Sequence, residues 1–392
     1  MARAEGREGR ARVLVVVGTR PEAVKMAPVL RALQEREGDL ETALALTGQH
    51  TAMVDQVLTT FGMEPDFDLQ VMREGQDQYD LAHACLDGLR RVTAEYRPDL
   101  ILVQGDTATV FYASLVGFLE RVRVGHVEAG LRSRDKWAPF PEEVYRRLAD
   151  VLADLYFAPT PRARENLLGE GIPAERIYLT GNPVVDAIRA VAGREGAPEN
   201  RILGRLRDSG APFALLTAHR RESFGAPLRE VFSAILALVE TRPELEILYP
   251  VHLNPQVQEP AREILSGHPR VHLTEPLGYL DLVRALSWAR LVLTDSGGIQ
   301  EEAPTFGVPV LVLREVTERP EGVEAGVARL VGTRKERILE AALSLLGQKD
   351  QGNSLQVPLN PYGDGKAGER IADIVQAALT GAPRKTADWD GL

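Results

Sequence analysis

Cysteine is almost absent from this sequence, and long apolar runs are absent altogether. The one cysteine, Cys85, has no second thiol in the chain with which to form a disulfide, which fits a reducing compartment. The apolar runs, such as residues 13–17 and 100–103, fall far short of the roughly 20 residues that cross a bilayer. The first dozen residues lack the apolar core of a signal peptide. We therefore expect a frayed start and a cytoplasmic protein that does not enter a membrane.

Basic patches and metal-ligand patterns are also missing. The formal net charge is −10, whereas proteins that bind nucleic acid or anionic membranes usually carry a basic stripe. No cysteine–histidine cluster has zinc spacing, and neither a P-loop nor a G-x-S-x-G motif occurs. We interpret the acidic triplets DFD at 66–68 and DWD at 388–390 as solvated loops, and GDGKAG at 363–368 as a turn into the last helix. These features predict a protein without a nucleic-acid partner, a metal or another cofactor.

Short β-branched runs alternate with longer amphipathic segments from residue 12 almost to the C-terminus, as is typical of βα units around parallel sheets. The predicted strands lie at 13–17, 42–46, 100–104, 123–127, 155–158, 177–179, 213–217, 246–249, 271–273, 291–294, 310–313 and 329–331. This pattern predicts an α/β protein of two Rossmann-like lobes, each with a parallel sheet. The lobes are expected at 12–192 and 200–362, with a linker at 193–200 and a C-terminal helix at 363–380 that returns to the first lobe.

Parallel sheets present ligands at the carboxyl ends of their strands, and the segment TDSGGIQEEAP follows one such strand. Ser296 can cap a helix there, while Gly297 and Gly298 let backbone N–H groups approach a phosphate. Glu302 returns to the same helix face and could accept hydrogen bonds from a ribose. The alternative is a well-capped helix with an acidic first turn, but the strand–Gly–Gly–helix context favours phosphate.

Basic side chains come directly after other predicted strands. GTRPE supplies Arg20, with Lys25 shortly after it, although an ordinary helix start explains this segment as well. TAHRRES places His219 and Arg220 after a strand of the second lobe, where they suit a diphosphate, and His252 is a weaker candidate after the next strand. Three other histidines are interpreted as structural or solvated: His83, His268 and His272.

Three acidic residues of the first lobe outline a different chemistry. Asp106 and Glu128 each follow a strand, and Glu142 opens a helix. Taken singly, structural roles are favoured: a helix cap for Asp106, a pair with Arg132 for Glu128, and a helix-dipole contact for Glu142. Taken together, crowded carboxylates shift one another's pKa values apart, so that one can act as acid and another as base. The set predicts a proton-transfer site that faces the cations of the other lobe across a cleft.

Ten segments in order resemble the non-hydrolysing UDP-N-acetylglucosamine 2-epimerases, from about residue 12 to 378. They are GTRPEAVKMAP, TGQH, VQGDT, GHVEAGLR, PFPEE, TAHRRESFG, YPVHLNP, LTDSGGIQEEAP, TERPEGVEAG and NPYGDG. The resemblance implies a GT-B-like fold without metal or nicotinamide, UDP-N-acetylglucosamine and UDP as ligands, and a homodimer. It also implies interconversion of UDP-N-acetylglucosamine and UDP-N-acetylmannosamine, by elimination and re-addition of UDP through a 2-acetamidoglucal.

The same resemblance assigns roles to individual residues. Catalytic roles fall on Asp106, Glu128, Glu142 and His219. Substrate-binding roles fall on Arg20, Lys25, Arg220, His252, Leu277, Leu282, Ser296, Gly297, Gly298, Glu302 and Arg319. Leu282 is a departure, because relatives often have Phe there near the uracil.

A second group of positions concerns activation by substrate. Gly75 and Ala52 replace the Arg and Gln that some bacterial relatives place around a second, activating substrate molecule, whereas Gln49, His50 and Gln76 remain as candidate allosteric residues. The sequence leaves open whether substrate activates this protein. Three other functions also stay open at this point: a glycosyltransferase, a hydrolysing epimerase that releases free N-acetylmannosamine, and an inactive sugar-nucleotide sensor. The sensor is disfavoured because all the candidate acids are present.

Overall fold

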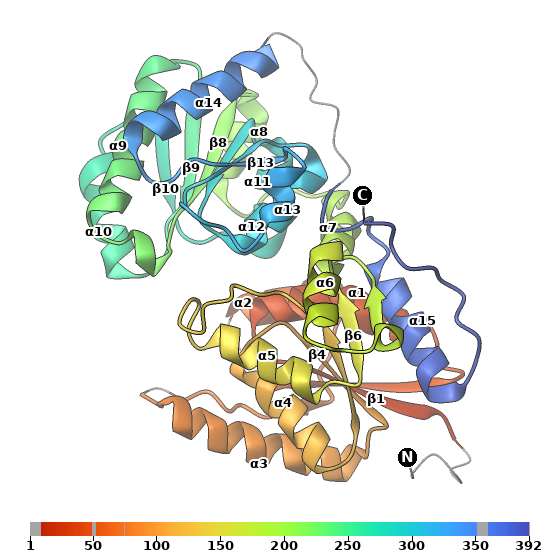
Figure 1. Cartoon of the computed structure of the whole chain (residues 1–392). Helices are drawn as coiled ribbons and strands as arrows, with labels where there is room; N and C mark the ends of the chain where they lie inside the picture. Colours follow the sequence, from red (N-terminus) through yellow and green to blue (C-terminus); the bar gives the residue numbers. More distant parts are fainter. Residues whose placement is uncertain (1–8, 49–51, 74, 351–359, 392) are drawn as a thin grey trace. The chain divides into compact units, whose positions relative to one another are not determined.

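The computed structural model describes residues 9–48, 52–73, 75–350 and 360–391, which form two compact units (Figure 1). The first unit takes in the described residues up to Ala187 together with the segment Gly363–Gly391. The second unit is Ile188–Tyr362, so the division falls within helix α7 (Pro183–Ala192). Residues 193–200 contain neither helix nor strand.

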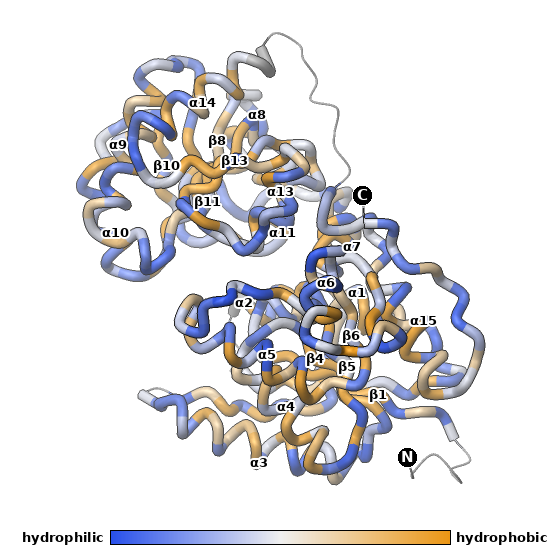
Figure 2. The backbone as a smooth tube through the Cα atoms, viewed as in Figure 1, coloured by the Kyte–Doolittle hydropathy of each residue, from blue (hydrophilic) through white to orange (hydrophobic). Residues whose placement is uncertain are grey.

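The first unit is built on a seven-stranded parallel sheet in the order β3-β2-β1-β4-β5-β6-β7. Its strands are β1 (Ala11–Val17), β2 (Leu40–Leu46), β3 (Phe67–Asp68), β4 (Leu100–Gln104), β5 (Arg123–Val127), β6 (Leu155–Ala158) and β7 (Ile177–Leu179). Every residue of β4 is buried, as expected for a strand of a parallel sheet that helices cover on both faces. Figure 2 shows the middle of this sheet as hydrophobic.

Helices before and after these strands cover the sheet. They are α1 (Arg20–Gln34), α2 (Ala52–Phe61), α3 (Gln78–Tyr96), α4 (Ala108–Leu119), α5 (Glu142–Leu152), α6 (Pro161–Gly169), the 3-10 turn η1 (Ala174–Arg176) and the C-terminal α15 (Ala367–Thr380). Helix α15 packs on α1 at very short range. A Cβ at Gly368 would lie 2.7 Å from the carbonyl oxygen of Pro28, so this approach requires glycine.

The second unit has a six-stranded parallel sheet in the order β10-β9-β8-β11-β12-β13. Its strands are β8 (Phe213–Thr217), β9 (Glu246–Pro250), β10 (Val271–Thr274), β11 (Leu291–Thr294), β12 (Val310–Val312) and β13 (Ala328–Leu330). Its helices are α8 (Arg201–Ser209), η2 (Arg221–Ser223), α9 (Ala226–Thr241), α10 (Pro255–Leu265), α11 (Tyr279–Trp288), α12 (Gly297–Glu302), η3 (Ala303–Phe306), α13 (Pro320–Glu324) and α14 (Lys335–Asp350). Leu215 and Leu216 of β8 belong to two different apolar clusters, because successive side chains of a strand point to opposite faces.

The predicted α/β class with parallel sheets is confirmed, and each of the twelve predicted strands is present within a residue or two. The GDGKAG segment leads into α15, as predicted. The interpretation of DFD as a loop is wrong, since Phe67 and Asp68 form β3 and pair with β2. The interpretation of DWD as a solvated tail is also wrong, because Trp389 is buried and its N–H donates to the Leu179 carbonyl at 2.8 Å. Across the described residues, no helix has the length and apolar character to span a bilayer.

Candidate active site

In the first unit, three polar donors converge on the buried carboxylate of Glu128. This residue follows β5, and β5 lies beside β4 in the sheet. Lys25 Nζ lies 2.6 Å from Glu128 Oε1, and Asn182 Nδ2 donates to the same oxygen at 2.9 Å. Gln104 Nε2, at the end of β4, donates to Oε2. The structure pairs Glu128 with Lys25 and not with Arg132, so the pair considered from the sequence is not formed.

Asp106, in the turn after β4, forms an ion pair with Arg146 of helix α5. Arg146 also donates to Glu143 Oε2 at 3.0 Å, and Glu143 in turn accepts from the backbone N–H groups of Ser133 and Arg134 at 3.0 and 3.2 Å. Helix α4 starts after Thr107, and no side chain caps it. Asp106 is therefore held by α5 while its side chain stays 29% exposed and accessible to a ligand.

Glu142 is the first residue of α5 and is partly buried. Its Oε2 atom is inaccessible to solvent and has no hydrogen-bond partner in the structure. A buried carboxylate oxygen without a donor is uncommon, because the energetic cost of such an atom is on the order of 1–3 kcal/mol. Arg146, the partner of Asp106, lies one helical turn further along α5. The first turns of α5 thus carry the candidate acid Glu142 and, through Arg146, orient the candidate acid Asp106.

Glu22 is a fourth carboxylate at this end of the sheet, and it was not among the residues selected from the sequence. It accepts from the Gly18 N–H at 2.5 Å and from the Thr19 hydroxyl at 3.1 Å, which closes the turn after β1. Burial raises the pKa of Glu22 to about 7, although the hydrogen bonds from Gly18 and Thr107 act in the opposite direction. The side chain is 2% exposed, so Glu22 is a buried acid that titrates near neutral pH.

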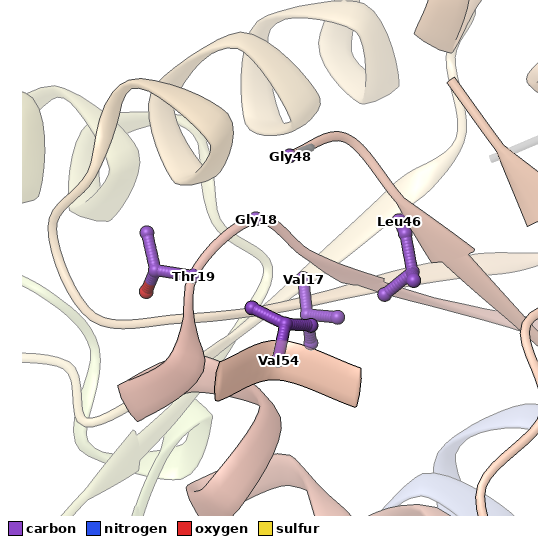
Figure 3. A pocket seen from close by; sticks show the side chains of 6 residues that line it. All are labelled: Val17, Gly18, Thr19, Leu46, Gly48 and Val54. Atoms are coloured by element: carbon purple, nitrogen blue, oxygen red, sulfur yellow. The ribbon is translucent and has the colours of Figure 1, made fainter. Parts of the chain in front are cut away.

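A small pocket lies where β1 and β2 end (Figure 3). Its lining residues are Val17, Gly18, Thr19, Leu46, Gly48 and Val54. A Cβ at Gly48 would lie 2.2 Å from the Gly18 carbonyl oxygen, so the two turns pack backbone against backbone. Arg20 begins α1 directly after this turn, and Lys25 lies further along the same helix.

The structure describes one of the three candidate allosteric residues. Gln49 and His50 lie outside the described residues. Gln76 is described, and its Oε1 accepts from the Arg73 N–H within a local turn. Its Nε2 lies 3.7 Å from the sulfur of Met72.

In the second unit, His219 and His252 come together at the ends of β8 and β9. Their rings stack with centroids 5.4 Å apart and planes 11° from parallel. Asp295, which follows β11, accepts from the backbone N–H groups of His219 and Arg220 at 2.7 and 2.8 Å, and its other oxygen lies 3.2 Å from His219 Nδ1. Burial lowers the pKa of His219, and the nearby charge of Arg220 adds to this effect while Asp295 opposes it. The imidazole of His219 is therefore neutral at neutral pH.

Two guanidinium groups flank the backbone at the start of α12. A Cβ at Gly297 would lie 3.4 Å from Arg319 Cζ and 3.7 Å from Arg220 Nη2. Arg319 also pairs with Glu301 at 2.8 Å. Burial alone would raise the pKa of Glu318, but the charges of Arg319, Arg314 and Arg220 lower it to about 2. Positive charge and backbone N–H groups therefore gather at one strand end, as anion binding requires.

The remaining predicted residues of the second unit lie around the same strand ends. Ser296 is the N-cap residue of α12, but its side chain makes no capping hydrogen bond, contrary to the simple helix-cap interpretation. Gly298 follows in the first turn, and Glu302 ends the helix with 9% of its surface exposed. Leu277 is buried and Leu282 partly buried in the apolar cluster that covers one face of the sheet.

The structure adds five residues to the candidates selected from the sequence, and most of the five contact one of those candidates. Glu22, Glu143, Arg146, Asn182 and Asp295 either lie buried beside a candidate or hold it by a hydrogen bond or ion pair. Asp295 alone among them carries a sequence signal, because it directly follows a predicted strand within TDSGG. Among the described residues, no group of three or more His, Cys, Asp or Glu side chains is arranged to hold a metal ion.

Known proteins show which family this chain is similar to. The family model described as UDP-N-acetylglucosamine 2-epimerase matches residues 31–376. The UDP-N-acetylglucosamine 2-epimerase of Yersinia pestis is 47% identical over 365 residues, which cover 92% of this chain and 97% of that protein. The structure of Staphylococcus aureus MnaA with UDP has a TM-score of 0.88 at 44% identity, covering 97% of this chain and 100% of that chain. The Neisseria meningitidis UDP-GlcNAc 2-epimerase bound to UDP-GlcNAc has a TM-score of 0.86 at 40% identity, covering 93% and 99%.

The fold places this chain in a structural class. Two parallel-sheet α/β units give a GT-B-like fold, and the glycotransferase of kitacinnamycin, 16% identical with a TM-score of 0.61, shares that fold. Within this class, the chain belongs to the UDP-N-acetylglucosamine 2-epimerase family. The resemblance inferred from ten sequence segments is thereby confirmed.

Proposed function

We propose that this chain is an isomerase that interconverts UDP-N-acetylglucosamine and UDP-N-acetylmannosamine. One observation carries the proposal: Asp106 and Glu128 lie at the ends of neighbouring strands, and cationic or amide side chains hold both carboxylates in place. Membership of the epimerase family supports it, as does the Neisseria meningitidis relative that binds UDP-GlcNAc.

The second unit is proposed to bind the nucleotide. Arg220 and Arg319 beside Gly297 suit the diphosphate, because guanidinium groups and free N–H groups both bind phosphate oxygens. Glu302 is proposed to bind the ribose, while Leu277 and Leu282 are proposed to pack near the uracil. The other assigned binding residues are Arg20, Lys25, His252, Ser296 and Gly298.

The first unit is proposed to move the proton. The C2–H bond of the sugar is not acidic while the anomeric C–O bond is intact, so UDP must leave with the bonding electrons as the proton departs. A carboxylate takes that proton, and a C1=C2 double bond forms, giving 2-acetamidoglucal. Another acid then protonates C2 from the opposite face, and UDP adds back to C1. Asp106, Glu128 and Glu142 are the proposed acids and bases, and neutral His219 is proposed to donate a hydrogen bond to the leaving diphosphate.

The test follows the fate of the C2 hydrogen. The protein is incubated with UDP-N-acetylglucosamine in deuterated water, and the products are observed by NMR. Deuterium at C2 in a sugar that is still linked to UDP supports the proposal. Release of free N-acetylmannosamine indicates a hydrolysing epimerase, transfer only when an acceptor is added indicates a transferase, and no turnover indicates a sensor.

Four further expectations remain predictions. The first is that the lobe at 12–192 carries the catalytic carboxylates and the lobe at 200–362 binds UDP. The others are the cytoplasmic location, the homodimer, and the role of Gln49, His50 and Gln76 in activation by substrate. Size-exclusion chromatography with light scattering measures the mass in solution. A sigmoidal rate curve that becomes hyperbolic in Gln76→Ala would support activation by substrate, whereas a hyperbolic curve for the wild type would contradict it.

A further inference from the structure

His126 lies in β5, two residues before Glu128, and its ring contacts the turn that leads to Asp106. Its side chain is completely buried. Nε2 lies 2.7 Å from the carbonyl oxygen of Gly105, and Nδ1 lies 2.6 Å from Asp150 Oδ1. His126 stands within the segment GHVEAGLR, but neither the sequence nor the proposed chemistry assigns it a role, although a buried polar ring between two acceptors requires an explanation.

The partners of His126 determine where its protons lie. A carbonyl oxygen only accepts, so Nε2 carries a hydrogen. Asp150 Oδ2 already accepts from Arg132 Nη2 at 2.7 Å and from the Gly130 N–H at 3.2 Å, which is the pattern of an ionised carboxylate. Nδ1 therefore donates to Asp150. Burial alone would lower the pKa of His126, but the Asp150 charge raises it, and His126 together with Arg132 lowers that of Asp150.

The first turn that this ring contacts leads into Asp106. Gly105 has a φ of +87°, its N–H donates to the Val127 carbonyl at 3.1 Å, and its own carbonyl accepts from His126. Because a peptide unit is planar, holding the Gly105 carbonyl fixes the plane that runs from the Gly105 Cα to the Asp106 Cα. The direction in which the Asp106 side chain leaves the backbone therefore depends on this hydrogen bond.

The second turn contains Glu128 and is strained. Glu128 has a φ of +67°, a conformation that costs a non-glycine residue about 1 kcal/mol or more. The turn persists because neighbouring groups hold it. Phe157 accepts from the N–H groups of Glu128 and Ala129, and Asp150 accepts from that of Gly130. His126 contacts the same Asp150, so one buried pair holds both turns.

We propose that His126, donating from both ring nitrogens, is a positioning residue that aligns the Asp106 and Glu128 turns for proton transfer. The inference rests on the proposed function for its catalytic consequence, but its geometric part can be measured independently. The charged and titratable groups that face the ring are Asp150 and, through it, Arg132, while Tyr156 of the adjacent strand donates its hydroxyl to the Asp150 backbone carbonyl.

Two substitutions separate the two donors of the ring. In His126→Gln the side-chain amide can replace Nε2 and still donate to Gly105, whereas in His126→Asn the shorter amide can replace only Nδ1. We expect kcat of His126→Asn to fall about 10-fold or more with KM little changed, because a displaced acid slows the chemical step and not nucleotide binding. His126→Gln should recover part of this loss. His272→Asn is the matched control, because His272 also pairs with a carboxylate, Glu246, but in the second unit.

Two measurements do not depend on activity. In wild-type protein labelled with 15N-histidine, both ring nitrogens of His126 should be protonated at neutral pH, and a neutral ring would overturn the proposal. Amide hydrogen exchange at residues 105–107 should be faster in His126→Asn than in His126→Gln. Equal exchange, or wild-type kcat in His126→Asn, would also overturn it. If the wild type itself does not epimerise, the proposed function fails, while the NMR and exchange results still decide the role of His126.

Discussion

Arg146 and Asp150 lie one turn apart on helix α5 and hold two different parts of the candidate active site. Arg146 pairs with Asp106, and Asp150 pairs with His126 and accepts from Gly130. Residues four apart share a face of a helix, so a single face of α5 reaches the turns after both β4 and β5. The alignment of the candidate acids therefore depends on how α5 packs on the sheet.

Replacing a candidate acid by its amide tests the proton-transfer proposal. Asp106→Asn and Glu128→Gln keep the side-chain shape but lose the ability to exchange a proton at neutral pH. Each should slow turnover by about 100-fold or more, the usual size of a general acid or base contribution. The measurement is kcat for epimerisation, together with deuterium incorporation at C2.

Asp388→Asn is the control for these variants. Asp388 resembles Asp106 in forming an arginine pair, with Arg384 at 2.8 Å, and in its exposure, 32% against 29%. It lies in the C-terminal tail, so its substitution should leave kcat unchanged. Wild-type turnover in Asp106→Asn or Glu128→Gln would remove that residue from the mechanism.

Glu22 should make stability fall as the pH rises towards neutrality. Its pKa is raised from 4.5 to about 7, so the folded protein holds this proton more tightly than the unfolded chain. Between these pH values the folded state binds more protons, and the free energy of unfolding therefore decreases with rising pH. The loss is nearly complete by pH 8 and amounts to at most about 3 to 4 kcal/mol, because the pKa rises from 4.5 to about 7 and one pKa unit corresponds to about 1.4 kcal/mol.

Glu22→Gln isolates this contribution, because its amide resembles the protonated acid. Urea unfolding of the wild type and the variant is compared at pH 5 and pH 8. The variant should gain stability relative to the wild type between pH 5 and pH 8. A difference between the two proteins that is the same at both pH values would contradict the raised pKa.

The sequence predicted the elements of the fold better than the partners within the site. Alternation of β-branched runs and amphipathic segments identified the strands, because burial in a parallel sheet imposes that pattern. The two-residue strand β3 is too short to give a pattern. The pairs of Glu128 with Lys25 and of Asp106 with Arg146 join residues 103 and 40 positions apart, so they depend on how strands and helices pack.

Arg319 should matter for nucleotide affinity and not for proton transfer. Its guanidinium lies beside Gly297, and a hydrogen bond to a charged group contributes about 1.5–3 kcal/mol. Arg319→Gln should therefore weaken UDP binding by roughly 10- to 100-fold, measured by titration calorimetry. Asp106→Asn should bind UDP like the wild type. Arg229→Gln, which removes an exposed pair with Glu263, is the control for loss of charge. An equal loss of UDP affinity in this variant would reject a local role for Arg319.

The C-terminal tail should contribute to the stability of the first unit through Trp389. This side chain is 4% exposed and belongs to the same apolar cluster as Leu179, whose backbone also pairs with it. A Cβ at Gly391 would lie 2.5 Å from Pro161 Cγ, so the tail follows the start of α6 closely. Trp389→Ala should destabilise the protein by about 3 kcal/mol or more, the usual cost of removing a buried aromatic side chain.

Trp389→Phe is the matched variant, because it retains an aromatic ring and should lose much less stability. Thermal and urea unfolding measure both variants. UDP affinity is measured alongside, and it should not change, since Arg220 and Arg319, which are proposed to bind the diphosphate, belong to the second unit. Unfolding of Trp389→Ala at the wild-type urea concentration would show that the tail does not stabilise the unit, and would restore the interpretation of a solvated segment.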